Sequence, residues 1–102
     1  MPRKHDRTSI SLEIILEFAS GTRNARVSDL SVGGCFVDTI VPVNVGETVN
    51  FKLRLTDNQW EDMKGSVAYI LPSFGFGLQF RGLTEQQKWQ ISDVLMINGG
   101  TA

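Results

Sequence analysis

Residues 49–56 read Val49-Asn50-Phe51-Lys52-Leu53-Arg54-Leu55-Thr56, in which apolar and polar side chains alternate strictly. Successive side chains of a β-strand point to opposite faces, so this alternation predicts a strand with one buried and one solvated face. Asp57 and Asn58 follow, and such residues are typical of a tight hairpin turn. The returning strand is predicted to hold Met63, Val67, Tyr69 and Leu71 on one face. The middle of the chain therefore predicts an antiparallel hairpin.

The same period of two is found on both sides of this hairpin. Upstream, residues 10–18 and 25–30 alternate, and a short β-branched and aromatic segment spans residues 35–40. A loop is expected between this segment and residue 49, because Pro42, Asn44 and Gly46 lie there. Downstream, one face of a last strand is predicted to point its aromatic rings into the core, and these rings are Phe74, Phe76 and Phe80.

After Leu83 the pattern changes to that of a helix. Thr84 and Gln87 have the spacing of a capping box, in which each side chain bonds the other residue's backbone N–H. The apolar stripe of the helix consists of Ile91, Val94 and Leu95, and Gly99-Gly100 are expected to end it. Trp89 is predicted to pack the helix against the strands, and Trp60 to be an exposed contact beside the hairpin turn.

These segments predict an all-β fold with one helix, namely a six-stranded antiparallel β-barrel followed by a C-terminal α-helix. Closure into a barrel hides the strand edges that would otherwise pair with other chains. The 102 residues, of which 41% are hydrophobic, suffice for one core. We therefore expect a single domain over residues 8–98, preceded by a flexible basic arm over residues 1–7.

The charge and the aromatic residues argue against a nucleic acid partner. The net charge is −1 and the pI about 5.7, so the chain lacks the positive field of a protein that coats a nucleic acid polymer. In the arm, Arg3, Lys4 and Arg7 outweigh Asp6 by two charges, which leaves −3 for the rest of the chain. A barrel that binds single strands should also expose its aromatic rings. Here the rings of Phe18, Phe51, Phe74, Phe76 and Phe80 are expected in the core.

The composition also argues against metal and redox chemistry. Cys35 is the only cysteine and His5 the only histidine, so neither an internal disulfide nor a zinc cluster of thiolate and imidazole ligands is expected. A lone cysteine fits a reducing compartment, and no apolar run suits a signal peptide or membrane insertion, so we expect a cytoplasmic protein. No set of serine, histidine and acid can be named for nucleophilic catalysis, so we expect no enzyme.

Two short motifs stand out, one just before the first strand and one at the end of the second. Arg3-Lys4-His5-Asp6-Arg7 fits the pattern RxxxR, and Asp29-Leu30-Ser31-Val32-Gly33-Gly34 fits [D/N]xSxxG. Both motifs in this order, on a chain that predicts a small β-barrel, resemble the PilZ domain family. The resemblance extends to two later segments, Gly65-Ser66-Val67 and Gly77-Leu78-Gln79-Phe80.

This resemblance implies a receptor for the bacterial second messenger cyclic di-GMP, with no other cofactor and no metal. The implied ligand-binding residues are Arg3, Arg7, Asp29, Ser31, Gly33 and Gly34, and Lys4, His5 and Gly77 are further candidates. An arginine fork donates two parallel hydrogen bonds to a guanine edge or a phosphate, which lysine does less well. By the same resemblance, Asp29 is expected to accept hydrogen bonds from a guanine.

The expected mechanism is a relay. The arm is expected to fold over the nucleotide and so to change the surface that an unidentified downstream protein recognises. Family precedents place such partners in motility, pilus or exopolysaccharide machinery. The alternative is a PilZ-like adaptor that binds no nucleotide and acts through protein contacts alone.

Overall fold

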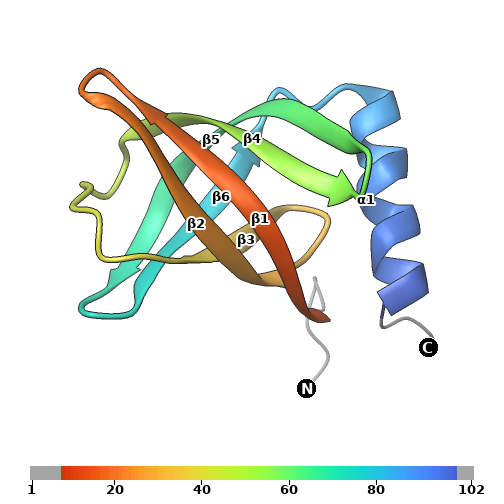
Figure 1. Ribbon diagram of the computed structural model, residues 1–102, viewed down its shortest axis with the longest axis horizontal. Helices are drawn as coiled ribbons and strands as arrows, with labels where there is room; N and C mark the ends of the chain where they lie inside the picture. The colour runs from red at the N-terminus through yellow and green to blue at the C-terminus, as the bar shows by residue number, and fades with distance from the viewer. Residues whose placement is uncertain (1–7, 99–102) are drawn as a thin grey trace.

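The computed structural model describes residues 8–98 of the chain. Its six antiparallel strands close into a barrel in the order β1-β2-β3-β6-β5-β4, and one helix follows them (Figure 1). The elements are β1 (Thr8–Phe18), β2 (Gly21–Leu30), β3 (Gly34–Asp38), β4 (Thr48–Thr56), β5 (Gln59–Leu71), β6 (Gly75–Arg81) and α1 (Glu85–Asn98). This architecture confirms the predicted fold class.

The barrel closes where β1 pairs with β4. Ile14 lies opposite Leu53 and Leu16 opposite Phe51, and all four side chains are buried in the barrel. The residues next to these in each strand face outward, and there Arg54 Nη1 lies 2.6 Å from Glu13 Oε2 across the same seam. The alternation read in the sequence therefore separates the core from the surface directly.

The helix begins with the predicted capping box. The Gln87 N–H donates to Thr84 Oγ1 at 3.0 Å, and the Thr84 N–H donates to Gln87 Oε1 at 3.1 Å. Ile91 and Val94 are buried against the barrel, where α1 contacts β1 and β4. The helix therefore packs on the barrel through the predicted stripe.

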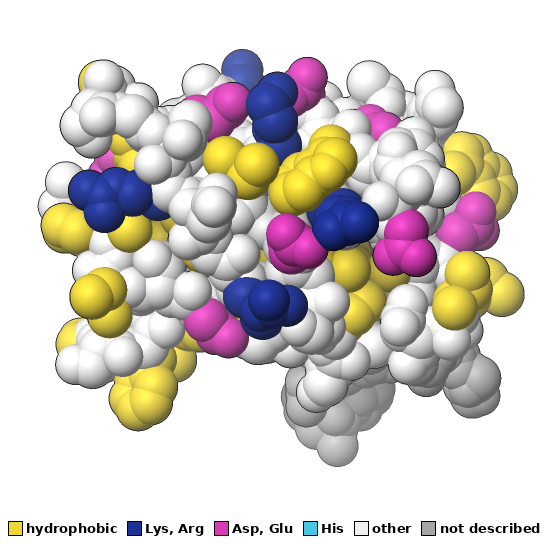
Figure 2. Space-filling model, viewed as in Figure 1, with side chains coloured by type: hydrophobic (Ala, Val, Ile, Leu, Met, Phe, Trp, Pro, Cys, Tyr) yellow, Lys and Arg dark blue, Asp and Glu magenta, His cyan; other side chains and the backbone are white. Residues whose placement is uncertain are grey.

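Trp89 does not pack the helix on the barrel, so that prediction is wrong. Its side chain is 68% exposed, whereas Ile91 is completely buried. Each residue turns a helix by about 100°, so two residues place Trp89 roughly opposite Ile91. Hydrophobic side chains are accordingly seen along the helix at the right edge of the molecule (Figure 2).

Phe74 is also outside the core, against the prediction. It is 71% exposed because it belongs to the turn before β6, where its N–H donates to the Leu71 carbonyl at 3.0 Å. Ser73 in this turn has a φ of 73°, and β6 starts only at Gly75. Phe76 and Phe80 are buried, as predicted.

A register shift changes the end of β5. Between Val67 and Tyr69 the pairing with β6 is interrupted by a bulge, so Val67 is buried while Tyr69 and Leu71 are partly exposed. The prediction that these three share one buried face is wrong for the last two, because an extra residue reverses the alternation. Strand β3 ends at Asp38, which leaves Ile40 in an exposed loop.

Candidate functional site

The second motif forms the tight connection between β2 and β3. Asp29 lies near the end of β2, and Gly34 starts β3. Between them, the Ser31 N–H donates to the Gly34 carbonyl at 2.9 Å and the Ser31 hydroxyl donates to the same oxygen at 3.3 Å. Ser31 is only 5% exposed, so its hydroxyl stabilises the turn and keeps lone pairs for a further donor.

The two glycines of this motif join the turn to β6. The Gly33 carbonyl accepts a hydrogen bond of 2.8 Å from the Phe80 N–H, and Gly34 pairs with Gln79. A Cβ atom at Gly34 would overlap the carbonyl oxygen of Leu78. Glycine at position 34 thus lets two strands approach closely, which is a structural requirement independent of any ligand.

A row of paired residues crosses the outer face of four strands next to this turn. Asp29 on β2 pairs with Phe36 on β3, Phe36 with Gly77 on β6, and Gly77 with Tyr69 on β5. The rings of Phe36 and Tyr69 stack with centroids 6.1 Å apart and an interplanar angle of 27°. We call these four residues the outer row.

Gly77 allows the rings to meet. A Cβ atom there would overlap the ring of Tyr69, so the tyrosine lies directly over the glycine. Phe36 is 8% exposed and Tyr69 is 38% exposed, so Tyr69 presents the accessible part of the aromatic surface. Neither ring was identified from the sequence as a site residue. The alternation of residues in the sequence does not reveal the bulge after Val67, which turns Tyr69 outward. The only signal in the sequence is Gly77, because a glycine within a strand often marks a place where another group approaches closely.

The first motif joins the barrel at the same place. Arg3, Lys4, His5 and Arg7 lie outside the described residues, which begin at Thr8. Thr8 pairs with Leu30, and Ser9 pairs with Asp29. The attachment point of the arm is therefore next to the second motif, although the two motifs are separated by two full strands in the sequence.

The rest of residues 8–98 offers little for other kinds of chemistry. No group of three His, Cys, Asp or Glu side chains is placed to hold a metal ion within this range. Cys35 is buried on β3. No helix in the described range has the length and apolar character needed to cross a membrane.

The chain matches the model of one known protein family. The family model described as PilZ domain matches residues 2–96, which include both motifs. The chain belongs to the PilZ domain family. The predicted resemblance is thus confirmed, and the barrel with its C-terminal helix is the PilZ fold.

Several solved structures have a similar fold. The Bacillus subtilis inhibitor of motility (MotI/DgrA) aligns with a TM-score of 0.77 and 16% identity over 91% of this chain and 48% of its own. YcgR from Escherichia coli in complex with c-di-GMP aligns with a TM-score of 0.80 and 14% identity over 95% of this chain and 46% of its own. The PilZ domain of YcgR from Escherichia coli with c-di-GMP aligns with a TM-score of 0.77 and 14% identity. The alignment covers 96% of this chain and 92% of its own.

These similarities have a defined scope. The chain spans about half the length of the first two proteins. At such identities the likeness shows the shared fold. Among curated protein sequences, no match is found.

Proposed function

We propose that this PilZ domain binds cyclic di-GMP on the outer face of β2, β3, β6 and β5 and passes the signal to a partner protein without catalysis. The observation that carries the proposal is the pairing of Thr8 with Leu30. It attaches the RxxxR arm beside the [D/N]xSxxG turn and beside the outer row. MrkH from K. pneumonia, another solved structure with this fold, is described as a complex with c-di-GMP.

Each element of this face suits one part of the nucleotide. Arg3 and Arg7 supply planar forks for a guanine edge or a phosphate, and Lys4 and His5 lie between them as further contacts. Asp29 is an acceptor for the N–H groups of a guanine. Tyr69 offers a partly exposed ring on which a base can stack.

The turn of the second motif supplies the remaining contacts. The oxygen of Ser31 can accept a hydrogen bond, since its proton is directed to Gly34. Gly33 and Gly34 have no side chains to block a ligand that approaches their backbone, and Gly77 keeps the outer row flat. In this proposal the arm closes over the nucleotide and so creates a new surface for a downstream protein.

The proposed function also has an expected cellular compartment. The buried, single cysteine suits a reducing compartment, so we place this function in the cytoplasm. A partner in motility, pilus or exopolysaccharide machinery would fit a relay of this kind. The MotI/DgrA protein, described as an inhibitor of motility, has the same fold.

The alternative function is a PilZ-like adaptor that acts through protein contacts without nucleotide. It is favoured by exposed apolar side chains at the loop end of the barrel, where Phe74 is 71% exposed and its carbonyl accepts a hydrogen bond from the Thr39 N–H. Ile40, which follows Thr39, is also exposed. Large exposed apolar side chains of this kind are typical of protein contacts.

Isothermal titration calorimetry separates the two functions. Cyclic di-GMP is titrated into the protein, with cyclic di-AMP and GTP as controls, and the Arg3→Ala/Arg7→Ala variant is measured alongside. We expect selective binding by the unchanged protein and a loss of roughly tenfold to a hundredfold per arginine in the variant. If the unchanged protein does not bind at high ligand concentration, the receptor function is excluded and the adaptor is favoured.

A further inference from the structure

Two basic side chains lie opposite each other on the outer surface of the barrel. Lys64 on β5 pairs with Arg81 on β6, and both are exposed. Like charges directly opposite in an antiparallel pair destabilise it. Neither side chain makes an ion pair with a carboxylate of residues 8–98. The salt bridges in this range are made by Lys52, Arg54 and Lys88. Within the described part of the chain, these two adjacent cations thus have no counter-charge.

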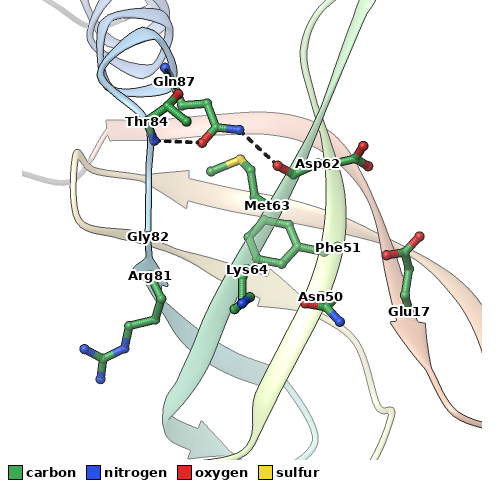
Figure 3. A pocket seen from close by; sticks show the side chains of 10 residues that line it. All are labelled: Glu17, Asn50, Phe51, Asp62, Met63, Lys64, Arg81, Gly82, Thr84 and Gln87. Carbon is green, nitrogen blue, oxygen red and sulfur yellow. Dashed lines mark hydrogen bonds between the residues drawn. The ribbon is translucent and has the colours of Figure 1, made fainter.

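These cations line one side of an open groove of about 470 Å³ between β4, β5 and the start of α1. Figure 3 shows Lys64 and Arg81 on the side of the groove toward β6, and Glu17 and Asp62 on the side toward β1. The volume is within the range of small-molecule sites, roughly 300–1,000 Å³. The groove is therefore large enough for part of a nucleotide.

The acidic side of the groove already has its own cation. Lys52 Nζ lies 2.5 Å from Asp62 Oδ1 and 3.9 Å from Glu17 Oε2. The hydrogen bond and charge of Asp62 raise the pKa of the Lys52 ammonium, in line with this ion pair. Counted with Lys52, the groove has three cations against the two carboxylates of Glu17 and Asp62, so its net charge is positive. The cations that make no ion pair within residues 8–98 are Lys64 and Arg81.

Arg81 is also adjacent to the second motif. It follows Phe80, whose N–H donates to the Gly33 carbonyl at 2.8 Å. Gly77 and Arg81 are four residues apart and share the outer face of β6, a separation of about 13 Å along the strand. The cation pair thus extends the surface that carries the outer row and the motif turn.

Ser66 orients the arginine. The Arg81 Nε–H donates to Ser66 Oγ at 3.1 Å, which directs the guanidinium along the outer face of β5 and β6. Its two terminal nitrogens make no hydrogen bond with residues 8–98. Arginine in this position has donors ready for a planar or tetrahedral anion.

We propose that Arg81 and Lys64 bind a phosphate group of the cyclic dinucleotide, with Arg81 held in place by Ser66. This inference rests on the proposed function and adds two residues that belong to neither motif. The bound phosphate supplies the counter-charge that the cross-strand pair lacks. The nucleotide then spans from the outer row, across the motif turn, to the edge of the groove.

The test compares Arg81→Gln and Lys64→Gln with the unchanged protein by calorimetry with cyclic di-GMP in a phosphate-free buffer. Arg23→Gln is the matched control, because it removes the same charge from an exposed position on β2. Arg23 is seven residues, or about 23 Å along the strand, from Leu30. We expect about tenfold weaker binding for Arg81→Gln, a smaller loss for Lys64→Gln and no change for Arg23→Gln.

Two further readouts identify the contact. Added inorganic phosphate should weaken cyclic di-GMP binding by the unchanged protein more than by Arg81→Gln, because the variant has lost one of the phosphate contacts. The ligand-free thermal midpoint of Arg81→Gln should be equal to or higher than that of the unchanged protein, since like-charge repulsion is removed. A lower midpoint with unchanged affinity would assign Arg81 to stability instead and overturn the proposal.

The measured affinities distinguish a failure of the phosphate contact from a failure of cyclic di-GMP binding itself. Binding by Arg81→Gln at the affinity of the unchanged protein would overturn this inference and leave the proposed function intact. Equal losses in Arg81→Gln and Arg23→Gln would show an effect of net charge only and would also overturn it. Absence of binding by the unchanged protein would overturn the proposed function together with this inference.

Discussion

Two glycines of the outer face are needed for different physical reasons. Gly34 faces a backbone oxygen of β6, which the barrel holds in place through strand pairing. Gly77 faces the ring of Tyr69, which belongs to a side chain with rotatable bonds. The same substitution should therefore be costly at the first position and tolerated better at the second.

Gly34→Ala should lower the free energy of unfolding by about 1–3 kcal/mol, because the new methyl group forces two paired strands apart. Gly77→Ala should cost less, since the ring can turn aside. Urea unfolding measures both. In a Tyr69→Ala background the cost of Gly77→Ala should nearly vanish, and that of Gly34→Ala should not. Equal costs at both glycines, insensitive to Tyr69, would contradict this account.

Tyr69→Ala should weaken cyclic di-GMP binding by about 1–3 kcal/mol, because a base loses its stacking surface. Tyr69→Phe should bind almost normally, since the ring is retained. Trp60→Ala is the control, because this exposed ring lies elsewhere on β5, 5.9 Å from the guanidinium of Arg54. Calorimetry gives the three affinities. A weaker Trp60→Ala, or a normal Tyr69→Ala, would argue against stacking at Tyr69.

At the level of single residues, the sequence alone locates only part of the candidate site. The motif residues Asp29, Ser31 and Gly34 could be named because their types and spacing match a family pattern. Phe36 and Tyr69 could not, because their contact depends on how three strands are registered. Arg81, which we propose as a phosphate contact, could not be named either, since the proposal depends on its neighbours Lys64 and Gly33 rather than on a sequence pattern.

Strands and helix were predictable where one period holds without interruption. Strand β4 alternates over its full length, and its buried residues are the predicted ones. Strand β5 departs from this rule after Val67, because a bulge inserts one residue and exposes Tyr69. Bulges and turn residues such as Ser73 are set by tertiary pairing, so local alternation does not reveal them.

The packing of α1 provides a test at the level of the element. Ile91→Ala should lower the free energy of unfolding by about 2–5 kcal/mol, because its side chain is completely buried against the barrel. Trp89→Ala should change it by less than about 0.5 kcal/mol, since that ring is mostly exposed. Denaturant unfolding distinguishes them. A larger loss at Trp89 than at Ile91 would mean that the helix packs through its other face.

For the whole molecule, the closed strand order brings distant parts of the sequence together. Thr8 pairs with Leu30, and β1 pairs with β4 to close the barrel. The sequence predicted a barrel because no strand edge should remain open, and its turn residues predicted the hairpin of β4 and β5. It contained no signal for the pairs that join strands far apart in the chain, such as β1 with β4 and β3 with β6. The position of Thr8, where the arm is attached, beside the second motif therefore becomes visible only in the folded chain.

A chain that begins at Thr8 should keep its ligand-free stability and lose its affinity for cyclic di-GMP. The buried core cluster runs from Ile14 to Val94, so none of its members is removed. Thermal unfolding and calorimetry measure the two properties, and the full-length chain is the control. A large drop in the thermal midpoint would show that residues 1–7 contribute to the folded barrel itself.

Tyr69 is the only tyrosine in the chain, and it lies on the outer row. Incorporation of fluorotyrosine would therefore place a single fluorine nucleus on this face, with no assignment needed. Its NMR line shape during a titration would report the exchange rate between free and occupied protein. The face proposed to bind the second messenger thus carries a single spectroscopic reporter of its own.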